Sequence, residues 1–176
     1  NTTHSNSYTN TQSTYSRSRT YKTITILPTS DDLPVEVFAS KLVAAFQQVG
    51  RSTIGLNQET TLTHLGRHAF DRLGKLKQSG YFSEIEKLYD IVVYIADPAI
   101  NPSWTKTCIS QGDCILLLCD AHGNTDIGDY ESLLVDSNTT ARTELILLHP
   151  ETFVEPGLTH KWLVPRPWVD AHHHIR

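Results

Sequence analysis

The chain has 176 residues, of which 39% are hydrophobic and 19% charged, a composition typical of one globular domain with a sizeable core. Its formal net charge is -4 and no basic stripe runs along the sequence, so we expect no nucleic-acid partner. The longest apolar runs, 91–96 and 114–119, are far shorter than the ~20 residues of a membrane helix, so we expect membrane contact only through the rest of a longer protein.

Residues 1–20 differ in composition from the rest of the chain. Ser, Thr and Asn occupy 14 of these 20 positions, and no aliphatic residue occurs among them. Such a segment cannot bury enough apolar surface to offset the entropy of ordering it. We therefore predict a disordered linker over 1–20 and a folded domain over 21–176. The sequence has no Met, even at position 1, which favours a segment of a longer chain.

Short β-branched or unbroken apolar segments, bounded by turn residues, predict five strands: 23–27, 52–56, 90–96, 113–119 and 144–149. After their first residues, Asp90 and Asp113, the third and fourth strands are unbroken apolar runs, which is typical of strands buried on both faces of a sheet. Helical crossovers separate the five strands. The pattern predicts an α/β fold in three layers, with a mainly parallel five-stranded sheet and helices on both of its faces.

Apolar residues at helical spacing, or the caps that precede a helix, predict these crossovers: 35–49, short helices broken by Gly66 and Gly74 over 58–75, a helix that begins at Ser83, 103–111, 126–136 and 158–163. Asp31 and Asp32 are expected to cap the first helix, with Pro34 at an early helical position. After Pro165–Trp168, the three histidines His172–His174 are expected to form a polar junction at the end of the domain.

The connection after the first strand, 28–34, lies where a phosphate-binding loop would stand in such a fold. It has neither glycine nor lysine, and Asp31 and Asp32 would repel phosphate at close range. Pro34 also lacks the N–H group that such a loop would use. We therefore expect no cofactor here. No G-x-S-x-G motif occurs in the sequence either, so no catalytic serine is expected within it.

The segments 89–98 and 112–118 resemble the ParA/MinD group of P-loop ATPases, in which an Asp at the end of a buried strand is followed by a helix and a further strand. The resemblance implies that Asp97 lies near the position of the metal-bound phosphates and that Val35 stands in place of the P-loop lysine. It implies a P-loop NTPase-like fold without a Walker A loop, and without the activity. Asp97 remains the candidate for a cofactor contact.

Two groups of histidines have spacings that could suit a metal ion. His64 and His68 stand four residues apart, but Gly66 weakens the helix between them and no Glu follows His64. His172–His174 are consecutive, and adjacent residues on a strand point to opposite faces of the sheet. We therefore expect no metal site in either group.

Arginine and tryptophan side chains supply the remaining candidates. Arg67, Arg142 and Arg166 could each pair with a carboxylate or an anion, although a solvated surface charge is the commoner role. Trp168 is expected to pack at the edge of the core or against a neighbouring domain. The candidates for a functional surface are His64, Arg67, His68 and Arg142.

Six segments carry a closer resemblance: Tyr21–Pro28, Leu62–Phe70, Trp104–Cys108, Thr139–Arg142, Leu147–Pro150 and Arg166–His174. Together they resemble the neuropathy target esterase family, and most of all its fungal lysophospholipases. The resemblance covers 21–176 and implies the degenerate P-loop-like domain between the cyclic-nucleotide-binding-like domains and the patatin catalytic domain. It implies a serine lysophospholipase that acts on lysophosphatidylcholine and phosphatidylcholine at the endoplasmic reticulum membrane, with this domain on the cytosolic side.

The resemblance places the catalytic Ser–Asp dyad in the patatin domain, so no catalytic residue is assigned to this chain. The first hypothesis is a non-catalytic structural or regulatory domain, whose interface with the patatin domain would include Arg166, Trp168, His172, His173 and His174. The alternative is a nucleotide-binding regulatory switch that uses Asp97 and a non-standard phosphate site. A free-standing flavodoxin-like binding protein is a third possibility, which the missing Met disfavours.

Overall fold

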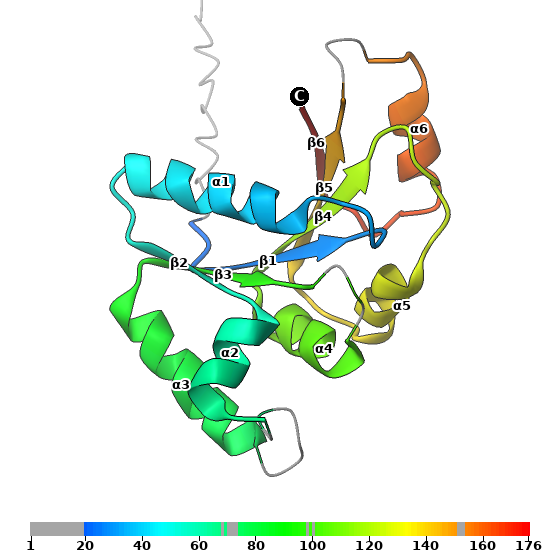
Figure 1. Ribbon diagram of the computed structural model, residues 1–176. Coiled ribbons are helices and arrows are strands. Elements are labelled where there is room, and N and C mark those ends of the chain that lie inside the picture. The colour runs from blue at the N-terminus through cyan, green and yellow to red at the C-terminus, as the bar shows by residue number, and fades with distance from the viewer. Residues whose placement is uncertain (1–19, 68, 70–73, 98, 100, 151–153) are drawn as a thin grey trace, which may run out of the picture.

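A six-stranded sheet forms the middle layer of the fold (Figure 1). The computed structural model describes residues 20–67, 69, 74–97, 99, 101–150 and 154–176. The strand order is β2-β3-β1-β4-β5-β6, and every neighbouring pair is parallel. The strands are β1 (Thr23–Pro28), β2 (Thr53–Leu56), β3 (Ile91–Ile95), β4 (Cys114–Asp120), β5 (Arg142–Leu148) and β6 (Ala171–Ile175).

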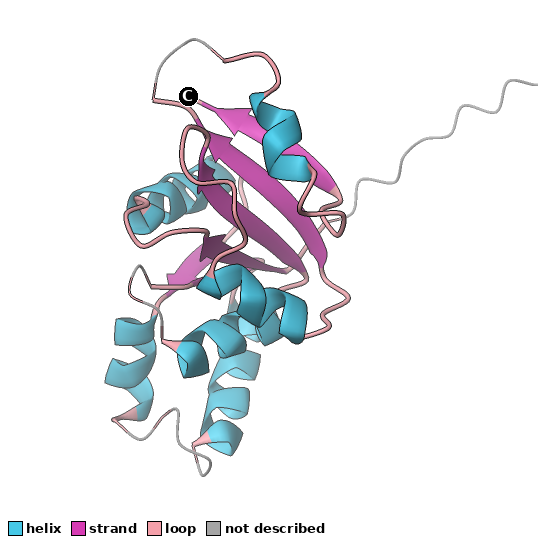
Figure 2. Ribbon diagram, turned by 90° about the vertical axis from the view of Figure 1, so that its right-hand side faces the viewer, coloured by secondary structure: helices cyan, strands magenta, loops and turns pink. Residues whose placement is uncertain are grey.

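Helices form the two outer layers: α1 (Val35–Gln48), α2 (Gln58–Leu65), α3 (Lys75–Leu88), α4 (Pro102–Gln111), α5 (Asp129–Asp136) and α6 (Leu158–Leu163). Helix α1 covers one face of the sheet, where Val35 and Ala39 pack with Ile26 and Val93. Helices α3, α4, α5 and α6 cover the opposite face (Figures 1 and 2). The predicted three-layer α/β architecture with a mainly parallel sheet is confirmed.

The central strand β4 shows why its sequence is apolar throughout. Leu116 and Leu118 belong to the core beneath α1, whereas Leu117 and Cys119 belong to the core beneath α4, α5 and α6. A strand covered on both faces must be apolar at successive positions, and all of β4 before Asp120 is buried. These runs made the central strands predictable from the sequence.

Two predicted helix caps are wrong. Helix α3 is continuous from Lys75 to Leu88, and Ser83 lies on its exposed side rather than at its start. The residue that precedes α1 is Pro34, and no side chain caps the helix. Asp31 instead accepts the Tyr130 hydroxyl, and Asp32 accepts the Ser30 hydroxyl.

The sheet has one strand more than predicted. The segment expected to be a polar junction is β6, in which His172 lies opposite Leu145 and His174 opposite Leu147. Its side chains are mostly exposed because β5 is its only partner in the described sheet. An exposed edge strand has no need of apolar alternation, so the pattern that identified the other strands was absent here.

Most of the predicted linker, residues 1–19, lies outside the described residues, and so does His68. Within the described ranges, no helix has both the length and the apolar character needed to cross a bilayer.

Candidate functional site

The carboxyl ends of β1, β3 and β4 lie along the edge of the sheet where folds of this kind bind ligands. Two N–H groups that flank the loop after β1 are bound within the protein. Thr29 donates its N–H to the Leu118 carbonyl over 2.9 Å, and Val35 donates to the Leu33 carbonyl over 2.8 Å. Pro34 has no N–H group. With neither glycine nor lysine besides, the loop differs from a P-loop, in which converging N–H donors hold a phosphate.

A tyrosine from α5 binds the carboxylate of the same loop. The Tyr130 hydroxyl lies 2.9 Å from Asp31 Oδ1 and 3.0 Å from the Asp97 carbonyl oxygen. Burial and the neighbouring Asp31 raise the pKa of Tyr130, which keeps its hydroxyl protonated as a donor. The loop that corresponds to a phosphate-binding loop thus contains a carboxylate, and this carboxylate already accepts a hydrogen bond from Tyr130.

Asp97 follows β3 at the same edge, and it is half-buried. Burial raises its pKa to about 6, and like-charge repulsion from Glu36 of α1 and Glu59 of α2 adds to the shift. Beside it lies an open hollow of about 310 Å³, lined by Gln58, Glu59, Leu62, Thr63 and Asp97. Acidic surroundings of this kind repel phosphate. We call Asp31, Asp97, Glu36 and Glu59 the acidic edge.

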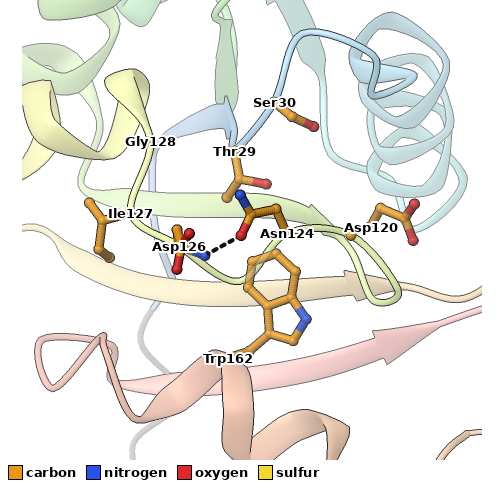
Figure 3. Close-up of a pocket in the computed structure, with 9 residues that line it drawn as sticks. Thr29, Ser30, Asp120, Asn124, Asp126, Ile127, Gly128 and Trp162 are labelled. Atoms are coloured by element: carbon orange, nitrogen blue, oxygen red, sulfur yellow. Dashed lines mark hydrogen bonds between the residues drawn. The ribbon is translucent and has the colours of Figure 1, made fainter.

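A second hollow, of about 170 Å³, opens between the ends of β1 and β4 (Figure 3). Its lining consists of Thr29, Ser30, Asp120, Gly123, Asn124, Asp126, Ile127, Gly128 and Trp162. Asn124 Oδ1 accepts the backbone N–H of Asp126 over 3.0 Å, which folds the loop over the hollow. The charged side chains of this lining are carboxylates, so it too is unsuited to a phosphate.

A buried ion pair fixes the loop between β4 and α5. Arg166 binds both carboxylate oxygens of Glu131, over 2.7 and 2.8 Å, and both side chains are fully buried. Its guanidinium group also donates to the carbonyls of Thr125, Asp126 and Trp162. The expectation that Arg166 is a surface residue is wrong, because this network satisfies its charge inside the domain.

Trp168 and the three consecutive histidines lie toward the β5–β6 side of the molecule. Trp168 is partly buried and lines a groove of about 230 Å³ with Leu134, Val135, Asn138, Thr139, Ala141 and Thr143. His173 contacts Glu144 over 3.0 Å, whereas His174 contacts His149 over 2.8 Å. The alternation of a strand separates their partners, as expected for adjacent histidines.

Of the four candidates for a functional surface, the three that the structure describes do not come together. His64 stacks on Tyr81 of α3 with ring centroids 5.0 Å apart, and Arg67 is exposed just beyond α2. Arg142 lies at the start of β5 and binds Glu144 over 2.8 Å. In the sheet, β5 is four places from β2, the strand that precedes α2. In the part of the chain that the structure describes, no group of three His, Cys, Asp or Glu residues is arranged to hold a metal ion.

Sequence reasoning placed Asp31 and Asp97 at this edge but missed their surroundings. In the sequence, Tyr130 has only the spacing of an apolar position on a helix, and nothing indicates that Glu131 is buried. For His149 the sequence does indicate burial, because this residue directly follows the buried strand β5. A histidine at the carboxyl end of an apolar strand is positioned at the ligand-binding edge of an α/β sheet.

Comparisons with known proteins agree with the fold and identify relatives. A family model described as the Neuropathy Target Esterase family P-loop like domain matches residues 20–176. Lysophospholipase NTE1 of Saccharomyces cerevisiae is 70% identical over 158 residues, which cover 89% of this chain and 9% of that protein. Lysophospholipase NTE1 of Candida glabrata is 60% identical over 173 residues, which cover 98% of this chain and 10% of that protein.

The chain therefore spans about a tenth of the length of these relatives. Among solved structures, the BceF Tyrosine Kinase Domain aligns with 87% of this chain and 68% of its own chain. The TM-score is 0.42 and the identity 8%, a similarity too low to inform fold or function.

Proposed function

The chain belongs to the neuropathy target esterase family as its P-loop like domain, and from this premise we propose that it is a non-catalytic structural or regulatory domain of a longer lysophospholipase. The proposed parent is a membrane-anchored serine enzyme that deacylates lysophosphatidylcholine and phosphatidylcholine. Its patatin domain would supply the catalysis. This domain would stand on the cytosolic side of the endoplasmic reticulum membrane, between the patatin and cyclic-nucleotide-binding-like domains.

The loop after β1 is the observation that carries the proposal. A nucleotide-hydrolysing domain of this fold needs free N–H donors and a lysine at that loop. Here Asp31 occupies the loop and accepts the Tyr130 hydroxyl, while Thr29 N–H is bound to β4. The position that would perform chemistry in a P-loop enzyme is therefore occupied by contacts that stabilise the fold.

Contact with the patatin domain is proposed through Trp168 and the exposed side chains of β6, His172, His173 and His174. These residues belong to an edge strand and to a groove beside it, both of which expose surface that a neighbouring domain could cover. Arg166 would support this interface from inside the domain, because its guanidinium group is buried against Glu131.

The full-length protein tests this interface with Trp168→Ala, compared with Leu88→Ala, which removes a 71% exposed apolar side chain at the end of α3. We expect Trp168→Ala to reduce lysophosphatidylcholine hydrolysis by more than its effect on the unfolding of the 176-residue chain explains. Leu88→Ala should leave hydrolysis unchanged. If Trp168→Ala alters neither activity nor stability, the interface proposal fails.

The alternative, a nucleotide-binding switch, rests on Asp97 and the hollow beside it. Calorimetric titration of the chain with ATP or GTP and Mg²⁺ separates the two functions. The proposed structural role predicts no saturable heat at millimolar nucleotide. Saturable binding that is lost in Asp97→Ala would establish the switch and contradict the structural role.

A further inference from the structure

Four histidines gather where β4, β5 and β6 end, beyond the acidic edge. His122 follows β4, His149 follows β5, and His172 and His174 lie on one side of β6. The rings of His149 and His174 stack with centroids 5.0 Å apart. His122 meets His149 edge-on at 6.2 Å, and His172 meets His174 edge-on at 5.7 Å. The cluster therefore joins the carboxyl ends of three neighbouring strands.

Hydrogen bonds connect two of these rings to a helix. His149 Nε2 lies 2.8 Å from His174 Nδ1, and His174 Nε2 lies 3.3 Å from the Thr159 hydroxyl of α6. The backbone N–H of His149 also donates to the Ile175 carbonyl over 2.8 Å. One chain of bonds thus links the end of β5, the end of β6 and the α6 layer.

The number of protons that these hydrogen bonds can hold favours neutral histidine rings. The bond between the two histidines needs one N–H donor and one bare nitrogen acceptor. His149 is only 5% exposed, and its Nδ1 has no hydrogen-bond partner among the described residues. A positive charge on His149 would put a proton on each of its ring nitrogens, so the buried Nδ1 would become a donor without an acceptor.

The surrounding charges also oppose protonation. The titratable and charged groups that act on the pair are Asp120 and His122 from the end of β4, and His172, His173 and Arg176 from β6 and its end. Burial, and then the neighbouring histidines and Arg176, lower the pKa of both His149 and His174 below the usual value of 6.5. Asp120 acts in the opposite direction on His149, but the sum favours the neutral form.

We propose that His149, His174 and Thr159 form an acid-sensitive latch, which holds the end of the edge strand β6 against the sheet when the rings are neutral and releases it when they are protonated. Apart from its ladder with β5, its only partner in the described sheet, the carboxyl end of β6 is held by these side-chain contacts. The latch would regulate how the exposed face of β6 is presented, and its residue His174 also belongs to the proposed interface. The latch itself depends on contacts within this domain and does not rest on that interface.

Linkage fixes the sign of the effect. The latched state has the lowered histidine pKa, so the released state binds more protons as pH falls below about 6.5. Each proton taken up on release increases the opening equilibrium by up to about tenfold per pH unit. Opening should therefore increase on acidification and be suppressed at neutral pH.

Amide hydrogen exchange of the 176-residue chain, followed by NMR, measures this opening strand by strand. Rates for 171–175 are compared between about pH 7 and about pH 5.5, after correction for the intrinsic exchange rate. His174→Gln retains a polar side chain that does not titrate, at an exposed position that the fold tolerates. His149→Gln tests the buried partner, and His64→Gln is the control, since His64 stacks on Tyr81 away from this cluster.

Corrected exchange of the β6 amides should accelerate by about tenfold on acidification, whereas that of the β1 and β4 amides should change little. His174→Gln should remove most of this acceleration, and His64→Gln should preserve it. The latch is refuted if the exchange of the β6 amides does not accelerate with acid. It is also refuted if β6 exchange in the His174→Gln variant accelerates as much as in the parent chain. If His149→Gln proves too unstable to measure, the His174→Gln result decides alone.

Discussion

The acidic edge and the histidine cluster both lie where parallel strands of one sheet end. The acidic edge lies beyond β1 and β3, and the histidine cluster lies beyond β4, β5 and β6. At the acidic edge, burial and nearby carboxylates raise the pKa of Asp97 to about 6. At the histidine cluster, burial and nearby cations lower the pKa of His149 and His174. Each region gathers groups of one kind, and each therefore disfavours their charged form.

The two regions respond to pH in opposite directions. Acidification neutralises Asp97 and so removes an unfavourable charge from the first region. It protonates the histidines and so adds an unfavourable charge to the second. Between them, the loop from β4 to α5 is held by a fully buried pair of opposite charges, Glu131 and Arg166. The comparison teaches that a buried ion pair is kept where partners of opposite sign bind each other directly, and that the charged form is disfavoured where groups of like charge predominate.

The largest effect should come from breaking that central pair. Arg166→Met leaves the Glu131 carboxylate buried without its partner, and it removes the donors to the Thr125 and Asp126 carbonyls. We expect the free energy of unfolding to fall by about 3–5 kcal/mol. Urea denaturation monitored by circular dichroism provides the measurement.

The control for this prediction removes both charges. Because Glu131→Leu with Arg166→Met leaves no unpaired charge in the core, the double variant should recover part of the lost stability. A double variant as unstable as Arg166→Met alone would show that packing and loop carbonyls, rather than the unpaired carboxylate, account for the loss.

An intermediate effect is expected from removing the donor at the acidic edge. Tyr130→Phe leaves Asp31 without the hydroxyl that lies 2.9 Å from its carboxylate. The loss should be about 1 kcal/mol, the size of a typical hydrogen bond at a partly exposed site. Urea denaturation at neutral pH measures it.

Tyr94→Phe provides a matched comparison, because Tyr94 also donates to a carboxylate, that of Glu86, over 2.9 Å. Both variants should lose stability. Because each hydroxyl donates to one carboxylate, the two losses should be similar in size, about 1 kcal/mol. A loss from Tyr130→Phe far smaller than that from Tyr94→Phe would show that the contact with Asp31 contributes little to stability.

Local pattern was enough to predict the central architecture. The apolar runs of β3 and β4 reveal strands buried on both faces, and the absence of glycine near Asp31 reveals the degenerate loop. The loop's position relative to Asp97 follows from the parallel order of the strands, since carboxyl ends meet at one edge.

The rest depends on contacts between distant residues, which local pattern does not encode. Glu131 and Arg166 lie 35 residues apart, and Tyr130 lies 99 residues from Asp31. Charged residues also read as surface residues unless a partner is known. The strand β6 was not predicted because an exposed edge strand does not need apolar residues, so its sequence shows no apolar pattern.

The effect that tests the comparison most directly is the titration of Asp97. Its folded pKa of about 6 exceeds the usual value of 3.8, so between these values the folded state binds more protons than the unfolded state. The contribution of Asp97 to stability is therefore full at low pH and is lost as pH rises through about 6. Asp97→Asn removes this dependence, and the parent should lose stability relative to it as pH rises from about 4.5 to about 7.

Glu36→Gln distinguishes repulsion from burial as the cause of that slope. Removing the neighbouring carboxylate should bring the pKa of Asp97 closer to its usual value and flatten the slope, while the burial of Asp97 remains. Urea denaturation of the three proteins at several pH values measures both changes. A parent that gains stability relative to Asp97→Asn on passing from acid to neutral pH would reverse the sign. The acidic edge would then resemble the histidine cluster, in which stability is lost on acidification, and the contrast between the two regions would disappear.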